Sequence, residues 1–124
     1  MTDFDDLAQR YIAAWNETDP AARRVLIDAL WTEEARYVDP MVVADGRDAI
    51  DATIGGVQSH FPGFTFRLAG PVDAHHDQAR FAWELGPAGA DAAEAPVAGF
   101  DVAIAGDDGR LRMVLGFLDR VPAA

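Results

Sequence analysis

Apolar residues recur every three to four positions near the start of the chain, which predicts an amphipathic helix over residues 3 to 17. The apolar stripe consists of Phe4, Leu7, Ala8, Tyr11 and Trp15. Thr2 and Asp5 have the spacing of a capping box, with Asp in place of the usual Glu. A second helix is expected from Asp19, which can cap it, with Pro20 at its first position. The expected apolar side of this helix is Val25, Leu26, Leu30 and Trp31.

The next segment predicts a short strand at about 36 to 39 and a third helix at about 47 to 60. The sequence ADGR between them is typical of a turn. Ile50, Ile54 and Val57 recur at helical spacing along one side of the third helix. The pair Gly55–Gly56 weakens the helix interior, which indicates close packing against another element.

From residue 64 onward the pattern is typical of strands. They are FTFRLAG, PVDAHH, ARFAWEL, VAGFDVAIAG and RLRMVLGFLDRV. A loop rich in Gly, Ala and Pro (86–96) precedes the fourth of these, and the turn DDG joins the last two. Helices come first and strands later, so residues 1–124 predict one α+β domain with helices on one face of a mainly antiparallel sheet.

Both faces of the last two strands are apolar. Along 97–105 the expected faces alternate, with Asp101 on the side opposite to Phe100. In the final strand one expected face is Leu111, Met113, Leu115 and Phe117, and the other is Val114, Gly116 and Leu118. An antiparallel strand with one solvated face is normally polar on that face. The helices cover one side, so we expect a second copy to cover the other, in a homodimer through the sheet.

Composition narrows the class of protein further. The formal net charge is −11, all ten basic residues are arginine, and cysteine is absent. The charge disfavours nucleic acid and anionic membranes as partners, and the lack of cysteine excludes disulfides and thiolate chemistry. No apolar run is long enough to span a membrane, and the acidic beginning of the chain differs from a signal peptide. We therefore expect a cytoplasmic location.

Three polar residues occupy positions where packing alone would favour apolar ones. Tyr11 lies on the buried stripe, where it is either a core tyrosine or a hydrogen-bond donor into a cavity. Asp39 precedes Pro40, where it either ends a strand or serves as a base. Asp101 interrupts an apolar strand, so it either faces water at an edge or is buried, and burial without a cation would raise its pKa.

The histidines do not predict a metal site. His75 and His76 are adjacent, so they would point to opposite faces of a strand, and only His60 remains besides them. The sequence contains no Gly-rich phosphate loop and no HExxH, and Ser59 is its only serine. These observations imply neither a metal nor a cofactor.

The order of elements resembles the nuclear-transport-factor-2-like superfamily, which includes SnoaL-like proteins, over nearly the whole chain. Three stretches resemble the bacterial steroid Δ5-isomerases (ketosteroid isomerases). They are QRYIAAWN (9–16), LWTEEARYVDP (30–40) and VAGFDVAI (97–104). The catalytic Tyr, the catalytic Asp before Pro and the second, protonated Asp of that family fall on Tyr11, Asp39 and Asp101. The resemblance implies a cone-shaped, strongly curved sheet packed on about three N-terminal helices.

In the resembled family, an Asp base works with a Tyr and a neutral Asp that bind the oxyanion. The resemblance therefore implies that Asp39 moves a proton next to a ketone of an apolar cyclic substrate, without a cofactor. Tyr11 and protonated Asp101 would bind the developing oxyanion. The candidate apolar wall consists of Trp15, Trp31, Phe61, Trp83, Phe117 and Leu118.

Two other functions stay open. One is a SnoaL-like polyketide cyclase or another acid–base enzyme, because the superfamily uses one kind of pocket for several reactions. The other is a non-catalytic pocket that binds an apolar small molecule. The segment before Trp31, the loop 86–96 and the pair His75–His76 depart from the steroid isomerases, and these departures leave the substrate open.

Overall fold

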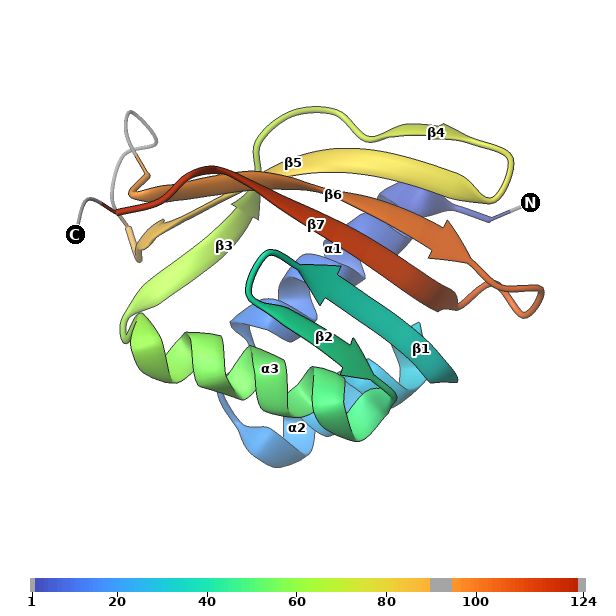
Figure 1. Ribbon diagram of the computed structural model, residues 1–124, viewed down its shortest axis with the longest axis horizontal. Helices are drawn as coiled ribbons and strands as arrows, with labels where there is room; N and C mark the ends of the chain where they lie inside the picture. The colour runs from blue at the N-terminus through green and yellow to red at the C-terminus, as the bar shows by residue number, and fades with distance from the viewer. Residues whose placement is uncertain (1, 90–94, 123–124) are drawn as a thin grey trace.

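The computed structural model describes residues 2–89 and 95–122. They form helices that lie on one side of a curved sheet (Figure 1). The helices are α1 (Phe4–Asn16), α2 (Pro20–Leu30) and α3 (Arg47–His60). The strands are β1 (Trp31–Asp39), β2 (Val42–Asp45), β3 (Phe64–Leu68), β4 (Asp73–His75), β5 (Gln78–Pro87), β6 (Val97–Ala105) and β7 (Leu111–Arg120). The predicted α+β class with three N-terminal helices is confirmed.

The starts of the first two helices have local causes. Asp3 caps α1 by accepting a hydrogen bond from the backbone N–H of Asp6, so the predicted capping box of Thr2 and Asp5 is wrong. Asp19 caps α2 as predicted, by accepting from the backbone N–H of Ala22. The buried side of α2 differs from the prediction, because Val25 is 69% exposed and Ile27 is buried in the core instead.

The sheet is mixed and open. Its order is β2-β1-β7-β6-β5-β3, with β4 paired to β5. β1 and β7 pair in parallel, and the remaining pairs among the described strands are antiparallel. The prediction of a mainly antiparallel sheet is confirmed. Strand β2 was not predicted, because the sequence ADGR was interpreted as a turn. Ala44 and Asp45 of that sequence belong instead to a hairpin with β1.

A bulge changes the predicted faces of β7. Ile104 pairs with Met113 while Ala105 pairs with Leu111, so Arg112 is an extra residue in β7. Leu111 therefore joins Val114 in the core, and both are almost fully buried. The prediction that Leu111 shares a face with Met113 and Phe117 is wrong, because the bulge shifts the alternation by one residue.

The structure describes only the two ends of the loop predicted at 86–96. β5 continues to Pro87, and Ala95 is buried. Residues 90–94 lie outside the described residues. None of the helices in the described ranges is both long and apolar enough to cross a membrane.

Candidate functional site

Asp101 lies near the middle of β6, on the side of the sheet that carries the core. Alternate residues of β6 are buried, and Asp101 is one of them, with 2% of its surface exposed. The Tyr11 hydroxyl on α1 donates a hydrogen bond of 2.7 Å to Asp101 Oδ2. Trp83 Nε1 on β5 donates to Asp101 Oδ1 at 3.2 Å. The local alternative, in which Asp101 faces water at an edge, is therefore wrong.

Burial sets the protonation of this pair. Removal from water raises the pKa of Asp101 to about 6, and the charge of Asp39 acts in the same direction, while the hydrogen bonds from Tyr11 and Trp83 oppose the rise. Burial and the neighbouring Asp101 raise the pKa of Tyr11 well above its ordinary value. Burial thus favours the protonated phenol of Tyr11 and the protonated carboxyl group of Asp101.

Asp39 ends β1 and is held by a different set of donors. Its Oδ1 accepts from the backbone N–H groups of Met41 and Val42, at 2.8 and 3.1 Å, in the turn between β1 and β2. Its Oδ2 accepts a hydrogen bond of 2.7 Å from the Tyr37 hydroxyl. Asp39 therefore caps a strand end, as the local interpretation predicted, and its Oδ2 is directed toward the core through Tyr37.

Sequence reasoning missed Tyr37 as part of the site. Tyr37 is two residues before Asp39, and residues two apart lie on the same face of a strand. Burial, together with the carboxylates of Asp101 and Asp39, raises the pKa of Tyr37. The spacing of Tyr37 and Asp39 in YVD was a usable signal for this contact.

Gly116 of β7 is the point at which these groups meet. It pairs with Asp101 across β6 and β7, and its neighbour Leu115 pairs with Val38 of β1. A methyl group placed on Gly116 would lie 2.9 Å from Asp101 Oδ1 and 3.3 Å from Asp39 Cβ. The same carbon would lie 3.4 Å from the Tyr37 hydroxyl oxygen. The missing side chain leaves room at this position for the Asp101 carboxyl group, the Asp39 Cβ and the Tyr37 hydroxyl.

Aromatic rings enclose this cluster, which we call the carboxylate cluster (Tyr11, Tyr37, Asp39, Asp101). The ring of Trp31 lies 6.0 Å from that of Tyr11 and is fully buried. Trp15 lies 6.1 Å from the Tyr11 ring and 5.5 Å from the Tyr37 ring. Trp15 Nε1 and Trp31 Nε1 are buried without a hydrogen-bond partner among the described residues.

The remaining candidate wall residues divide between two faces. Leu118 packs on the core side against the cluster formed by Trp83, Leu85 and Val97. Phe117 lies on the opposite face, where it is 49% exposed and stacks on Phe100 with ring centroids 4.9 Å apart. Phe117 is therefore not part of the wall, because its strand turns it away from the helices.

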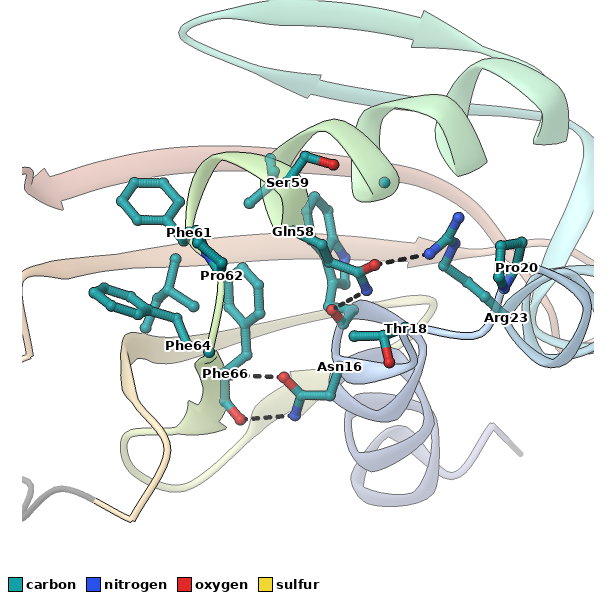
Figure 2. A pocket seen from close by; sticks show the side chains of 15 residues that line it. Asn16, Thr18, Pro20, Arg23, Gln58, Ser59, Phe61, Pro62, Phe64 and Phe66 are labelled. Atoms are coloured by element: carbon teal, nitrogen blue, oxygen red, sulfur yellow. Dashed lines mark hydrogen bonds between the residues drawn. The ribbon is translucent and has the colours of Figure 1, made fainter.

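A cavity of about 580 Å³ lies beside the carboxylate cluster, between the C-terminal ends of α1 and α3 and strand β3 (Figure 2). Trp15 and Phe61 line it, as expected of wall residues. Among the described residues, Tyr11, Asp39 and Asp101 do not line it. Trp15 connects the two regions, since it lines the cavity and packs against Tyr37.

Two of the three histidines, His75 and His76, stand apart from this site, whereas the ring of His60 lies 4.9 Å from that of Phe61, which lines the cavity. His75 and His76 are exposed, and their rings lie 5.5 Å apart. Within residues 2–89 and 95–122, no group of three or more His, Asp or Glu side chains is placed to hold a metal ion.

The architecture defines a small α+β domain that carries the carboxylate cluster between a curved sheet and three helices. A family model described as the SnoaL-like domain matches residues 8–113. The chain belongs to this SnoaL-like family, within the nuclear-transport-factor-2-like superfamily.

Solved structures agree with this assignment. A protein from Agrobacterium tumefaciens, titled a "putative isomerase" of the SnoaL-like family, is 41% identical, with a TM-score of 0.85 over 92% of this chain and 95% of that one. A "putative polyketide cyclase" from Sinorhizobium meliloti is 14% identical, with a TM-score of 0.69 over 90% of this chain and 93% of that one. The second likeness shows the fold alone. A search of curated proteins finds no match.

Proposed function

We propose that the protein is a cofactor-independent acid–base enzyme that moves a proton next to a ketone of an apolar cyclic substrate. The observation that carries the proposal is the buried hydrogen bond between Tyr11 and Asp101, which lies beside a second carboxylate, Asp39. A buried carboxyl group with a raised pKa next to another acid is an arrangement typical of functional sites.

Asp39 is the proposed base. Its Oδ2 takes the proton from the carbon next to the carbonyl, and the electron pair of that C–H bond moves into a dienolate. Asp39 then returns the proton to a carbon further along the dienolate, so no atom is gained or lost. The two backbone donors to Oδ1 hold the carboxylate in place during both steps.

Tyr11 and Asp101 are the proposed oxyanion donors. The Tyr11 hydroxyl now donates to Asp101 Oδ2 at 2.7 Å. When that O–H turns to a substrate oxygen placed beside both groups, the oxygen can accept from Tyr11 and from protonated Asp101. The 2% exposure of Asp101 favours its neutral form, because burial disfavours its charge. Preorganised donors of this kind contribute about 3–4 kcal/mol each to the transition state.

The comparisons support this class of reaction in part. The Agrobacterium tumefaciens protein at 41% identity is described as a "putative isomerase", and the proposed movement of a proton along a dienolate is an isomerisation. A SnoaL-like polyketide cyclase is the second candidate, because Asp39 with one oxyanion donor would also serve an aldol-type ring closure.

The test offers the protein a β,γ-unsaturated ketosteroid and follows the absorbance of the conjugated enone. We expect turnover by the native chain and a loss of about 10²–10⁴-fold in Asp39→Asn, because the amide cannot act as a base. Asp45→Asn is the matched control, since Asp45 lies on the same hairpin in an exposed ion pair with Arg36. Turnover that is undiminished in Asp39→Asn would exclude the mechanism.

The cavity favours a non-catalytic binder as the competing function, because the carboxylate cluster does not line it. No turnover across a panel of cyclic ketones, combined with tight binding of an apolar ligand, would establish that function instead.

We also propose that two copies associate through the outer face of the sheet. Phe100 and Phe117 stack there, and Val43 is 58% exposed on β2, which β1 separates from β7 in the same sheet. Exposed apolar surface of this kind is typical of an interface. Sedimentation should give twice 13.4 kDa for the native chain and a monomer for Phe117→Asp. Val25→Asp, on the exposed side of α2, is the control that should leave the mass unchanged.

A further inference from the structure

The cavity beside the carboxylate cluster has two chemically different ends (Figure 2). Phe61, Phe64 and Phe66 line one end, and Arg23 of α2 lines the other, with Gln58 of α3 between them. A cavity with an apolar end and one defined polar group is the usual form of a small-molecule site.

The aromatic end is open to a flat ring. The three phenylalanines are only partly buried, although they pack against one another and the core. The rings of Phe61 and Phe64 lie 5.4 Å apart, and Phe66 contacts Trp15 with ring centroids 5.2 Å apart. A planar apolar molecule placed here would cover aromatic surface that now faces the cavity.

At the arginine end, the Nη2 group of Arg23 is a hydrogen-bond donor without a partner among the described residues. Arg23 is 8% exposed, and its Nε donates to Asp51 Oδ1 at 2.7 Å. Its Nη1 donates to Gln58 Oε1 at 2.7 Å and to the Glu17 carbonyl at 3.3 Å. Within the described parts of the chain, Nη2 makes no hydrogen bond. An arginine that is more than nine-tenths buried with a free donor group, lining a cavity, is matched to an acceptor from outside the protein.

Gly55 of α3 keeps that donor accessible. A methyl group on Gly55 would lie 3.2 Å from Arg23 Nη2, whereas one on Gly56 would meet nothing within 4 Å. The prediction of close packing at this glycine pair is therefore confirmed for Gly55 and wrong for Gly56.

The charges around Arg23 select a neutral acceptor. Asp51 already balances the guanidinium, and the chain carries a net charge of −11, which repels anions. A carbonyl oxygen accepts one hydrogen bond without adding negative charge next to Asp51.

We propose that this cavity binds a planar apolar molecule with a neutral carbonyl oxygen, its rings against the three phenylalanines and its oxygen on Arg23 Nη2. The proposal goes beyond the proposed function, because it concerns binding at residues that take no part in the proton transfer assigned to Asp39.

The experiment measures binding by equilibrium dialysis with three naphthalene probes. 2-Acetylnaphthalene carries the carbonyl, 2-isopropenylnaphthalene has the same shape without an acceptor, and 2-naphthoate carries a negative charge. We expect the ketone to bind at least about tenfold more tightly than the alkene, because a hydrogen bond to a charged group is gained. We expect the carboxylate to bind more weakly than the ketone.

Two glycine variants locate the site without removing the buried ion pair of Arg23 and Asp51. Gly55→Ala crowds Nη2 and should remove most of the preference for the ketone over the alkene. Gly56→Ala, the matched control one residue further along α3, should leave the preference unchanged. Phe61→Ala should weaken the ketone and the alkene by a similar factor, because both use the aromatic end.

Three results would overturn the proposal. The first is equal binding of ketone and alkene, which would show that Nη2 is not used. The second is tighter binding of the carboxylate, which would show an anion site. The third is a ketone preference that survives in both Gly55→Ala and Arg23→Lys when thermal unfolding shows that the variants are folded. Each of these results comes from a binding measurement. It therefore does not depend on whether the protein turns over the ketosteroid.

Discussion

Asp39 and Asp101 are the same residue type in two different environments on the core side of one sheet. Asp39 is half-buried at a strand end, and three protein donors satisfy its oxygens. Asp101 is almost fully buried in the middle of a strand, and two side chains donate to it. The backbone donors belong to Asp39 alone, whereas the deeper burial of Asp101 favours its neutral form.

The donors also differ in their distance along the chain. Those of Asp39 lie two or three residues away, so its environment forms with the hairpin of β1 and β2. The donors of Asp101, Tyr11 and Trp83, are 90 and 18 residues away. The environment of Asp101 therefore exists only when α1 has packed onto the sheet. This contrast is the basis of the two proposed roles, a base for Asp39 and a hydrogen-bond donor for Asp101.

The largest expected effect on stability concerns the titration of Asp101. Its pKa is raised from 3.8 to about 6 in the folded state, so the folded protein holds a proton that the unfolded chain has lost. Its contribution to the free energy of unfolding is present below about pH 4 and is lost as the pH rises through 6, by about 3 kcal/mol in all. Asp101→Asn does not titrate, so between pH 4 and 7 its stability should rise relative to the native chain by that order. Urea unfolding at several pH values measures this difference, and parallel curves for the two proteins would contradict it.

Gly116→Ala tests whether the two carboxyl groups share one position. The added methyl carbon would meet Asp101 Oδ1 at 2.9 Å and Asp39 Cβ at 3.3 Å, so the side chains must move apart. We expect a loss of about 1–3 kcal/mol in the free energy of unfolding, as in other overpacked sites. Gly56→Ala faces open space on a helix and should stabilise the protein instead, by about 0.5–1 kcal/mol. Equal effects of the two substitutions would show that Gly116 is not crowded.

The smallest expected effect comes from Tyr37→Phe, which removes one donor from Asp39. Two backbone donors and partial contact with water remain, so we expect a loss of about 1 kcal/mol. Tyr11→Phe leaves the buried Asp101 with Trp83 alone and should cost about 2 kcal/mol at pH 7. Urea unfolding of both variants at that pH checks the order, and a larger loss in Tyr37→Phe would reverse the comparison.

Local patterns were sufficient to predict most elements of the fold. Asp19 and Pro20 located the start of α2, because a cap and a first-turn proline act within one helical turn. The errors arose where the tertiary structure overrides a local pattern. The local sequence of β2 is typical of a turn, and only its pairing with β1 makes it a strand. The bulge at Arg112 moves Leu111 into the core, and the alternation of apolar residues does not indicate this shift.

The candidate site divides in the same way. Tyr11, Asp39 and Asp101 were found as polar residues in apolar surroundings. The resemblance to the steroid isomerases indicated that the three belong to one site. Tyr37 and Gly116 were not found. A tyrosine is ordinary in a strand, and the alternation of β7 does not reveal that Gly116, in its interior, lies against Asp101. Phe117 was assigned to the wall because its apolar character does not reveal which face it occupies.

The sequence by itself determined the helices, most of the strands and the capping of a turn by Asp39, because these depend on residues within a few positions of one another. Only the tertiary structure decided that Asp101 is buried, that Tyr11 donates to it, and that Gly116 brings it next to Asp39. The pKa of a carboxyl group depends on lost water and on donors from distant strands and helices. Those are properties of the packed chain, and the order of residues alone does not contain them.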